Sequence, residues 1–344
     1  MITRGEYTRE EIFSQPEAWV NAIAVLKECA PEIRDFSRGD HHQVIFTGCG
    51  STYYLSCAAA ALFQEMTGIA ARGLPASELW LSPQSAFCSN GSTALIAISR
   101  SGETSETLQA CEVFRGRNKG MIMTLVCDPN SSLAKTGSLN IIFPSGMEKS
   151  IAQTRAFSTL YLGVVGLSSI WADQTQRLDQ LSTLPMIGRK ILTDYSKLAE
   201  SYGRNLNLDR VYFLGSGGRY GLACELNLKM KEMSLTHSEA FHFLEFRHGP
   251  KSMVNQNTLM VGLVSEANEQ HELAVLRDCK ELGAEIITMG ERNFDISFNS
   301  GLEEVNRSIL YLPFGQMLAY DRSIAKGFDP DHPKNLDPVV LLSR

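Results

Sequence analysis

The sequence contains the same short motif twice. Residues 44–57 read VIFTGCGSTYYLSC, and residues 211–224 read VYFLGSGGRYGLAC. The two stretches align without gaps at an offset of 167 residues, and 7 of their 14 positions are identical. Because this offset is about half of the 344-residue chain, the repeat indicates two copies of one domain fold and not a short-period solenoid.

Each copy predicts a doubly wound α/β domain. An apolar run ends in a Gly-x-Gly turn, a helical stretch follows, and further short apolar runs alternate with helical patterns, as in a parallel sheet covered on both faces. We expect two tandem flavodoxin-like domains, with a linker at 173–190 interrupted by Pro185 and Gly188. The expected boundaries are 1–35 for a helical extension, 36–185 and 195–312 for the two domains, and 313–344 for a helix and tail.

The composition points away from nucleic-acid and membrane partners. With 32 basic against 38 acidic residues, the formal net charge of −6 provides no basic field for a nucleic-acid backbone. The longest largely apolar stretch, 160–172, is too short to span a bilayer, and the first residues lack the apolar core of a signal peptide. The eight cysteines are scattered and form no Cys-x-x-Cys pair. We therefore expect a cytoplasmic protein with reduced thiols and no metal site.

Two polar turns follow expected strands of the first half. The turn at 48–53 reads GCGSTY, and the sharper one at 99–107 reads SRSGETSET. Hydroxyl and backbone NH groups at a helix start can surround a phosphate without a lysine. The same residue types also cap helices, so capping is the competing interpretation. The density of hydroxyl groups in the second turn favours an anion site.

A dinucleotide site is a further alternative that the glycine spacing excludes. The third glycine of Gly-x-Gly-x-x-Gly is replaced by Tyr53 in the first copy and by Tyr220 in the second. The motif therefore fails twice, and we expect no nucleotide cofactor.

A third polar group lies in the second half. Lys229 and Glu232 are three residues apart, so they share a helix face, either as a surface pair or as a site carboxylate beside an ammonium. His248 precedes Gly-Pro, which places it on a loop. The sequence leaves a structural and a functional role for this histidine equally open.

Together these motifs resemble the tandem sugar-isomerase (SIS) domain family, particularly the isomerase half of glucosamine-6-phosphate synthases. RHGPKSMV also resembles the tagatose-6-phosphate ketose/aldose isomerase-like branch, whose members are often assigned as amino-sugar-phosphate deaminases. The resemblance covers nearly the whole chain. It is carried, in order, by EIFSQP, GCGSTYY, ISRSGETSET, SIAQTRAFST, FLGSGGRYGLACELNLKMKE, HSEAFHFLEFRHGP and LAYDRSIAKGFDPDHPKNL.

The resemblance implies a phosphosugar site without a metal or redox cofactor. It implies that Glu232 shuttles a proton between C1 and C2 with Lys229 beside it. It also implies that His248 opens the sugar ring and reaches the site of a neighbouring subunit, which makes the protein a homodimer. Ile151 and Gln153 would touch the sugar. The implied phosphate ligands are Ser51, Thr52, Ser99, Arg100, Ser101 and Thr104.

Three departures from the synthase pattern direct the expected activity. The chain shows no glutaminase domain, Gln153 replaces a sugar-contacting serine, and Pro338 stands where the synthase has a Schiff-base lysine, with Lys334 four positions away. We therefore expect isomerising deamination of an amino-sugar 6-phosphate to a ketose 6-phosphate and ammonia. The alternatives are an aldose–ketose 6-phosphate isomerase, a sugar-amine 6-phosphate deglycase, and a non-catalytic phosphosugar-binding regulator.

Overall fold

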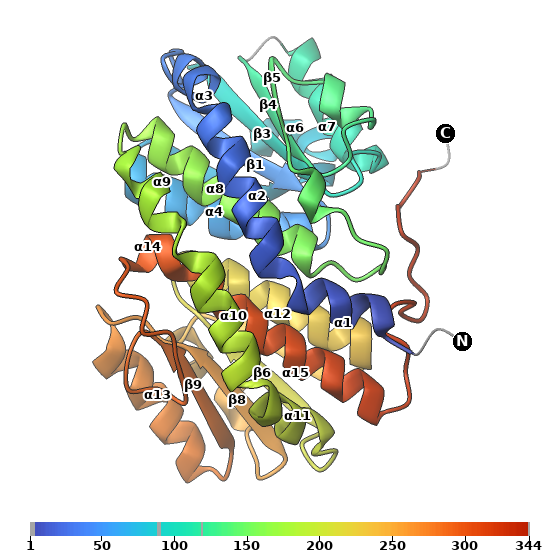
Figure 1. Cartoon of the computed structure of the whole chain (residues 1–344), viewed down its shortest axis with the longest axis vertical. Helices are drawn as coiled ribbons and strands as arrows, with labels where there is room; N and C mark the ends of the chain where they lie inside the picture. The colour runs from blue at the N-terminus through green and yellow to red at the C-terminus, as the bar shows by residue number, and fades with distance from the viewer. Residues whose placement is uncertain (1–3, 88–90, 118–119, 343–344) are drawn as a thin grey trace. The chain divides into compact units, whose positions relative to one another are not determined.

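The computed structural model describes residues 4–87, 91–117 and 120–342, and the chain divides into two compact units (Figure 1). The N-sheet unit, as we call it, consists of Glu17–Glu148, Arg155–Thr183 and Asp337–Arg344. The C-sheet unit consists of Met1–Pro16, Lys149–Thr154 and Leu184–Leu336. Each unit contains one copy of the repeated motif and is described separately below.

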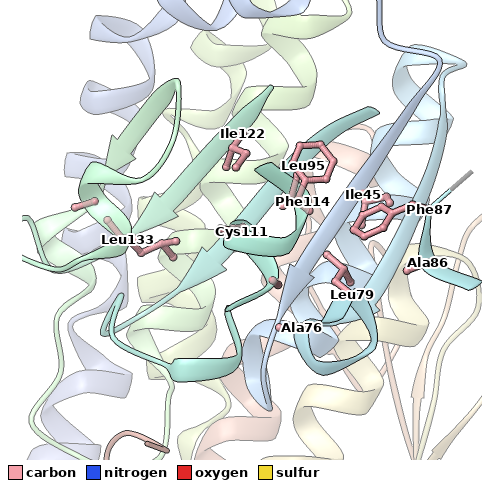
Figure 2. Close-up of a cluster of buried hydrophobic side chains, with 14 residues drawn as sticks. Ile45, Ala76, Leu79, Ala86, Phe87, Leu95, Cys111, Phe114, Ile122 and Leu133 are labelled. Carbon is pink, nitrogen blue, oxygen red and sulfur yellow. The ribbon is translucent and has the colours of Figure 1, made fainter. Parts of the chain in front are cut away.

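The N-sheet unit contains a parallel five-stranded sheet in the order β2-β1-β3-β4-β5. Every residue of β3 and β4 is buried, as expected for central strands covered on both faces. Figure 2 shows one such face, where Ile45, Leu95 and Phe114 pack into a single apolar cluster. The strands are β1 (Gln43–Gly48), β2 (Ala70–Pro75), β3 (Thr93–Ser99), β4 (Ile122–Val126) and β5 (Leu139–Ile142).

Helices connect and cover these strands. Between β1 and β2, α4 begins at the Gly-x-Gly turn, and the run of small residues in its middle, 56–61, allows close packing on the sheet. The helical elements that lie wholly or mainly in this unit are α2 (Gln15–Glu28), α3 (Ala30–Ser37), α4 (Ser51–Thr67), α5 (Ala76–Leu81), α6 (Pro83–Ala86), α7 (Ser105–Gly116), η1 (Leu133–Lys135), η2 (Pro144–Gly146), α8 (Arg155–Trp171) and α9 (Gln176–Leu181).

The C-sheet unit repeats the design with the order β10-β9-β8-β6-β7, again all parallel. Its strands are β6 (Arg210–Leu214), β7 (His237–Phe241), β8 (Thr258–Leu263), β9 (Glu285–Gly290) and β10 (Ile296–Ser297). Its helical elements are α1 (Glu6–Phe13), α10 (Leu184–Asp194), α11 (Ser196–Arg204), α12 (Gly218–Ser234), η3 (Glu245–Arg247), η4 (Pro250–Met253), α13 (Glu269–Glu281), α14 (Glu304–Arg307), η5 (Ser308–Tyr311) and α15 (Leu312–Ala325).

The predicted fold class, two doubly wound parallel α/β copies related by duplication, is confirmed. In each sheet the first strand of the copy lies between its second and third strands. The order in which strands are added to the sheet therefore reverses there, although all strands stay parallel. This switch point falls between β1 and β3 in one sheet and between β6 and β8 in the other. Ligands of doubly wound folds bind at the carboxyl edge beside such a point.

The expected linker breakers are wrong. Pro185 and Gly188 both lie inside helix α10, which runs from Leu184 to Asp194. Proline is tolerated in the first turn of a helix because the amide it lacks has no intrahelical partner there. Gly188 is buried in the same helix, so it marks a packing position and not a chain break.

The described part of the chain contains free cysteines and no membrane-spanning helix. Seven cysteines are free in the described part of the chain, four of them buried, while Cys88 lies outside the described residues. No helix among those described has both the length and the apolar character needed to cross a membrane.

Candidate active site

The turn Ser99–Ser105 joins β3 to α7 at the carboxyl edge of the first sheet. The Ser99 hydroxyl accepts a hydrogen bond from the Gly102 amide at 3.0 Å, and the Ser101 hydroxyl accepts one from the amide two residues later at 3.2 Å. Within the described residues, Thr104 makes no side-chain capping bond to α7. The turn therefore gathers several hydroxyl groups at the start of a 12-residue helix, where anions are stabilised, and two of these hydroxyls bond amides of the turn itself.

A neighbouring loop braces this turn. The Glu103 carboxylate accepts hydrogen bonds from the Ser132 amide at 2.6 Å and the Ser132 hydroxyl at 2.9 Å. The Gly102 carbonyl accepts one from the Leu133 amide at 3.1 Å. Gly102 has a φ of 67°, and a Cβ added there would lie 2.1 Å from the Ser131 hydroxyl oxygen. Both its backbone conformation and the space around it thus require glycine.

The first polar turn uses its hydroxyl internally. The Thr52 hydroxyl, near the start of α4, donates to the Cys49 carbonyl and accepts from the Cys49 amide, each at 2.9 Å. Ser51 and Thr52 are both buried. The Cys49 sulfur lies 3.5 Å from the Thr107 hydroxyl, so this turn contacts α7, and burial raises the pKa of the Cys49 thiol to about 11. The hydroxyl of the predicted phosphate ligand Thr52 is therefore bonded to the backbone of Cys49 in this structure. The turn that contains it packs beside the candidate anion site through the contact with Thr107.

Arg100 is buried beside a carboxylate that sequence reasoning missed. Its guanidinium Nη1 lies 3.6 Å from Glu148 Oε2, and the Glu148 side chain is fully buried. The other carboxylate oxygen of Glu148 accepts a hydrogen bond from the Arg155 amide at 2.6 Å. Glu148 could have been suspected from the sequence only as an acidic residue just before SIAQTRAFST. The predicted phosphate ligand Arg100 thus has an internal carboxylate contact in this structure.

The C-terminal tail lies along the same turn. The Pro338 carbonyl accepts a hydrogen bond from Arg100 Nη2 at 3.3 Å. The Val340 carbonyl accepts one from the Ser105 amide at 3.4 Å, and the Leu342 amide donates to the Ser105 hydroxyl at 3.2 Å. At the position where the resemblance puts a lysine, this chain therefore offers a backbone carbonyl to Arg100.

Helix α12 of the C-sheet unit holds the candidate proton-transfer group. The Lys229 ammonium lies 2.5 Å from Glu232 Oε2 and 3.4 Å from Glu225 Oε1. The side chains of Lys229 and Glu225 are fully buried, whereas that of Glu232 is 18% exposed. Spacings of three and four residues place all three on one helix face. The interpretation as a surface ion pair is therefore wrong, because the Lys229 side chain is fully buried. A buried ammonium is stable only with charged partners, and the two glutamates supply them.

Sequence reasoning also missed Glu225. Its signal was present, because it precedes Lys229 by one helical turn in ELNLKMKE. The buried ammonium between two carboxylates leaves Glu232 as the partly exposed member of the group. Glu232 is thus the carboxylate of this group that a ligand can reach.

His248 lies in the turn between η3 and η4 and is exposed. Its amide donates to the Glu245 carbonyl at 2.9 Å, and its ring makes no hydrogen bond to the described residues. The two short helices on either side are fixed through Asp278, which pairs with Arg247 at 2.9 Å and Lys251 at 3.4 Å. The loop is therefore anchored while the imidazole remains available.

Ile151 and Gln153 belong to a short segment of the C-sheet unit, Lys149–Thr154. The Ile151 amide donates to the Asp331 carbonyl at 3.1 Å. The side-chain oxygen of Gln153 is buried and has no hydrogen-bond partner among the described residues. A buried acceptor without a donor is costly, so this oxygen is suited to a ligand hydroxyl or amino group.

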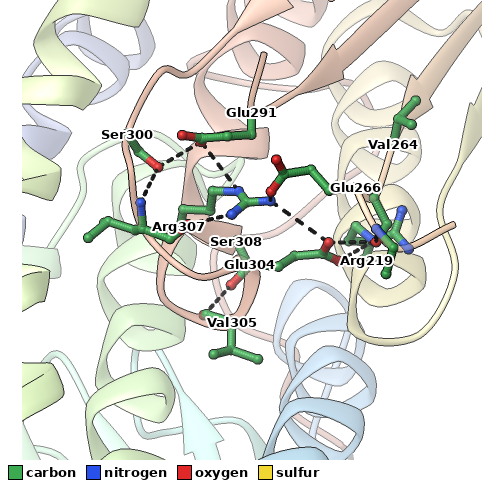
Figure 3. Close-up of polar contacts among 12 residues, drawn as sticks. Arg219, Val264, Glu266, Glu291, Ser300, Glu304, Val305, Arg307 and Ser308 are labelled. Carbon is green, nitrogen blue, oxygen red and sulfur yellow. Dashed lines mark hydrogen bonds and ion pairs between the residues drawn. The ribbon is translucent and has the colours of Figure 1, made fainter. Parts of the chain in front are cut away.

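In the second copy, the turn that follows β8 contains a carboxylate of the chain itself. The Glu272 carboxylate accepts the Ser265 amide at 2.8 Å and a two-pronged contact from Arg219 at 2.9 and 3.0 Å. Glu304 links Arg219 to Arg307, at 2.9 and 3.9 Å (Figure 3). The Glu272 carboxylate, from the first turn of α13, thus occupies the amide of Ser265 in the loop after β8. In the second copy, a carboxylate–arginine network therefore follows the third strand, where the first copy has the hydroxyl-rich turn Ser99–Ser105.

Metal-ligating side chains do not gather in the described part of the chain. Across residues 4–87, 91–117 and 120–342, no group of three or more His, Cys, Asp or Glu residues is placed to hold a metal ion. His242 instead stacks on Tyr220 with ring centroids 4.0 Å apart, and burial lowers its pKa. We assign no residue to a metal or cofactor.

A separate cavity of about 340 Å³ lies in the C-sheet unit, between α1, α11 and α15. Arg9, Glu200, Arg204 and Asp321 line it, with none of the residues predicted for catalysis. Burial, and next the negative charge of Glu200, raise the pKa of Asp321 to about 6, against the opposing charges of Arg204 and Arg9. The Asp321 carboxylate therefore destabilises the folded chain when it is ionised.

Replacing Asp321 by asparagine is expected to stabilise the protein above pH 6. The folded pKa exceeds the unfolded one, so the native state binds more protons between about pH 4 and pH 6, and wild-type stability falls as pH rises through that window. For a half-buried carboxyl screened by solvent, we expect a gain of about 1 kcal/mol at pH 8 that vanishes near pH 4. Urea unfolding at both pH values measures this. Equal stabilities at pH 8 would contradict it.

The fold places the chain in the class of tandem, duplicated doubly wound α/β proteins, whose ligands bind at the carboxyl ends of the strands. The SIS domain model matches residues 39–166 and 206–296. The chain belongs to the SIS domain family, which confirms the predicted resemblance.

Known proteins show the same likeness. The glutamine–fructose-6-phosphate aminotransferase (isomerizing) of Methanothermobacter thermautotrophicus is 26% identical over 99% of this chain, which spans 59% of that protein. A glucosamine-6-phosphate deaminase structure from Thermotoga maritima is 27% identical, with a TM-score of 0.77, over 94% of this chain and 100% of that one. A tagatose-6-phosphate ketose/aldose isomerase structure from Escherichia coli, 22% identical over 96% of this chain and 98% of that one, shares the fold with a TM-score of 0.85.

Proposed function

We propose that the chain catalyses the isomerising deamination of an amino-sugar 6-phosphate to a ketose 6-phosphate and ammonia. The observation that carries this proposal is the Lys229–Glu232 pair, in which a buried ammonium holds a partly exposed carboxylate at 2.5 Å. The 27% identity to a glucosamine-6-phosphate deaminase over the full length of that chain supports the choice of substrate class. The braced turn Ser99–Ser105 supplies groups suited to the phosphate.

The proposed reaction divides into ring opening, proton transfer and hydrolysis. His248 donates a proton to the ring oxygen while the bond between C1 and that oxygen breaks, and the anomeric hydroxyl gives its proton to water as it becomes the aldehyde. Glu232 takes the C2 proton and returns it to C1, while a proton from nitrogen passes to O1, so the 2-amino aldose becomes a 2-imino compound. The Lys229 ammonium holds the Glu232 carboxylate in place during this step. Water then adds at C2 and the C2–N bond breaks, which releases ammonia and leaves the ketose.

Plain aldose–ketose isomerisation is the second candidate. The same Glu232 step interconverts an aldose and a ketose when C2 carries a hydroxyl in place of an amino group. The unpartnered Gln153 oxygen favours a donor at the sugar, and both an amino group and a hydroxyl satisfy it. The substrate's C2 substituent therefore decides between the two reactions.

We also propose that the active form is a homodimer in which His248 acts on the sugar bound by its neighbour. Its exposed ring, which lacks a hydrogen-bond partner among the described residues, supports this role. The fixed η3–η4 loop keeps the position of the ring constant.

A substrate panel tests the proposed function. Purified protein is incubated with glucosamine 6-phosphate, galactosamine 6-phosphate, their 2-hydroxy counterparts and a sugar-amine 6-phosphate adduct, and ammonia, free amine and ketose are measured. We expect equal amounts of ammonia and ketose from at least one amino sugar. Ketose from the 2-hydroxy sugars alone would establish the isomerase, and free amine from the adduct alone would establish the deglycase. Binding without any product would establish the regulator.

A further inference from the structure

The segment Lys149–Thr154 is fastened by a carboxylate from the first helix. Glu11 of α1 is 2% exposed, and its Oε1 accepts hydrogen bonds from the Lys149 amide at 2.5 Å and the Ser150 amide at 3.2 Å. Its Oε2 accepts the Ser150 hydroxyl. One buried side chain thus fixes two successive amides and a hydroxyl, 138 and 139 residues away in sequence. Such charge-assisted bonds in a buried place are strong and well defined in direction.

A second buried carboxylate holds the helix that carries Glu11. Asp331 is 2% exposed and accepts the amide and hydroxyl of Thr8, each at 2.7 Å, and the Tyr7 amide at 3.1 Å. Asp331 therefore caps α1 from 323 residues away, since it accepts amides of the first helical turn. The residue before the helix, Gly5, makes no side-chain cap. The Asp331 carbonyl in turn accepts the Ile151 amide at 3.1 Å.

Among the described residues, one buried side-chain acceptor of this segment is left without a hydrogen-bond partner. At its end, the Thr154 carbonyl accepts a hydrogen bond from Gln316 of α15 at 3.2 Å. Between the fixed ends, the Gln153 side-chain oxygen is buried without a partner among the described residues. A rigid backbone therefore presents a single unpaired acceptor in a fixed place, which is the arrangement expected of a preorganised ligand contact.

We propose that Glu11 is a positioning residue for sugar recognition, which fixes the segment Lys149–Thr154 so that Gln153 accepts a hydrogen bond from the substrate. Asp331 supports it by capping α1 and holding Ile151. This inference rests on the proposed function for the identity of the ligand, an amino-sugar 6-phosphate. It extends that function to EIFSQP and DPDHP, two stretches to which the proposed reaction assigns no role.

The test compares two ligands of the wild-type chain and of Glu11→Gln by calorimetry. Glucosamine 6-phosphate probes the sugar contact, and inorganic phosphate probes the turn Ser99–Ser105 alone. We expect Glu11→Gln to weaken glucosamine 6-phosphate binding about tenfold, as small misplacements of a binding group do, with phosphate affinity within about twofold of wild type. We call this difference, weaker binding of the sugar phosphate with unchanged binding of phosphate, the ligand split. Gln153→Ala should show the same split, and the double variant should lose no more affinity for glucosamine 6-phosphate than either single variant.

Hydrogen exchange and two further variants complete the test. Glu11→Gln should speed amide exchange at 149–151 and leave exchange in the core of the second sheet unchanged. Glu10→Gln, an exposed neighbour on the same helix, is the control and should change neither binding nor exchange. If Glu11→Gln does not fold, Ser150→Ala should show the same split between ligands at about threefold. Equal weakening of both ligands, or no weakening, would overturn the proposal.

The binding readout separates this inference from the proposed function. Absence of ammonia release with the ligand split intact would refute the deaminase and leave Glu11 as a positioning residue. Ammonia release without the split would leave the deaminase and refute the role of Glu11. Wild-type protein that binds glucosamine 6-phosphate no more tightly than inorganic phosphate would also refute it, because the segment would then contribute nothing to affinity.

Discussion

Replacing Glu232 by glutamine is expected to lower kcat for ammonia release by about 10²- to 10⁴-fold. Glutamine keeps the size and most hydrogen bonds of the side chain but is unable to take up the C2 proton. Because the phosphate turn lies on β3 and α7 and is untouched, KM should change by less than about threefold. Steady-state assays of ammonia and ketose with glucosamine 6-phosphate measure both constants.

The control for this variant is Glu281→Gln, the same exchange at an exposed position on α13 of the same unit. It should leave kcat and KM as in wild type. Turnover of Glu232→Gln within about threefold of wild type would rule out this carboxylate as the proton carrier. An equal loss in the Glu281 variant would show that charge in this unit, and not the position of Glu232, is responsible.

Replacing Gly102 by alanine should damage phosphate binding without unfolding the chain. The φ of 67° costs an L-residue about 1–2 kcal/mol, and the new Cβ would meet the Ser131 hydroxyl oxygen at 2.1 Å. The turn must then move away from the loop that braces it. We expect the Kd for inorganic phosphate and the KM for the sugar phosphate to rise at least about tenfold, with kcat lowered less. Calorimetry and steady-state kinetics measure these changes.

Gly116→Ala provides the matched control on the same helix. A Cβ at Gly116 meets no atom of the described residues within 4 Å, and its φ lies outside the left-handed region. Alanine in a helix is more stable than glycine by about 0.5–1 kcal/mol, so the control should melt no lower than wild type and bind phosphate normally. Unchanged phosphate affinity in Gly102→Ala would show that the turn Ser99–Ser105 does not bind the phosphate.

Much of the fold could be predicted because local sequence patterns, such as repeats, apolar runs and helical spacing, determine it. The ungapped repeat at 44–57 and 211–224 gave the duplication, and short apolar runs such as 93–99 gave the parallel strands. The spacing of Lys229 and Glu232 gave their contact, because a helix brings residues three apart together. Pro185 was misjudged because proline breaks helix interiors but is accepted in a first turn.

The remaining site residues depend on contacts that no local pattern reports. Glu11 reaches Lys149, and Asp331 caps a helix 323 residues earlier, so neither partner could be inferred from spacing. Arg100 was expected as a phosphate ligand, yet its contact with buried Glu148 follows from chain packing. The second copy shows the same limit, since the buried pair of Glu272 with Arg219, 53 residues apart, could not be inferred from spacing.

The most direct measurement of the central proposal is the fate of the C2 hydrogen of glucosamine 6-phosphate in deuterated water, followed by NMR with the wild-type chain. We expect a ketose 6-phosphate with deuterium at C1, formed together with an equal amount of ammonia, because the proton carried by Glu232 exchanges with solvent before it returns. Tight binding of the sugar phosphate with no deuterium incorporation and no ammonia would contradict an enzyme of this kind and would identify the chain as a phosphosugar-binding regulator.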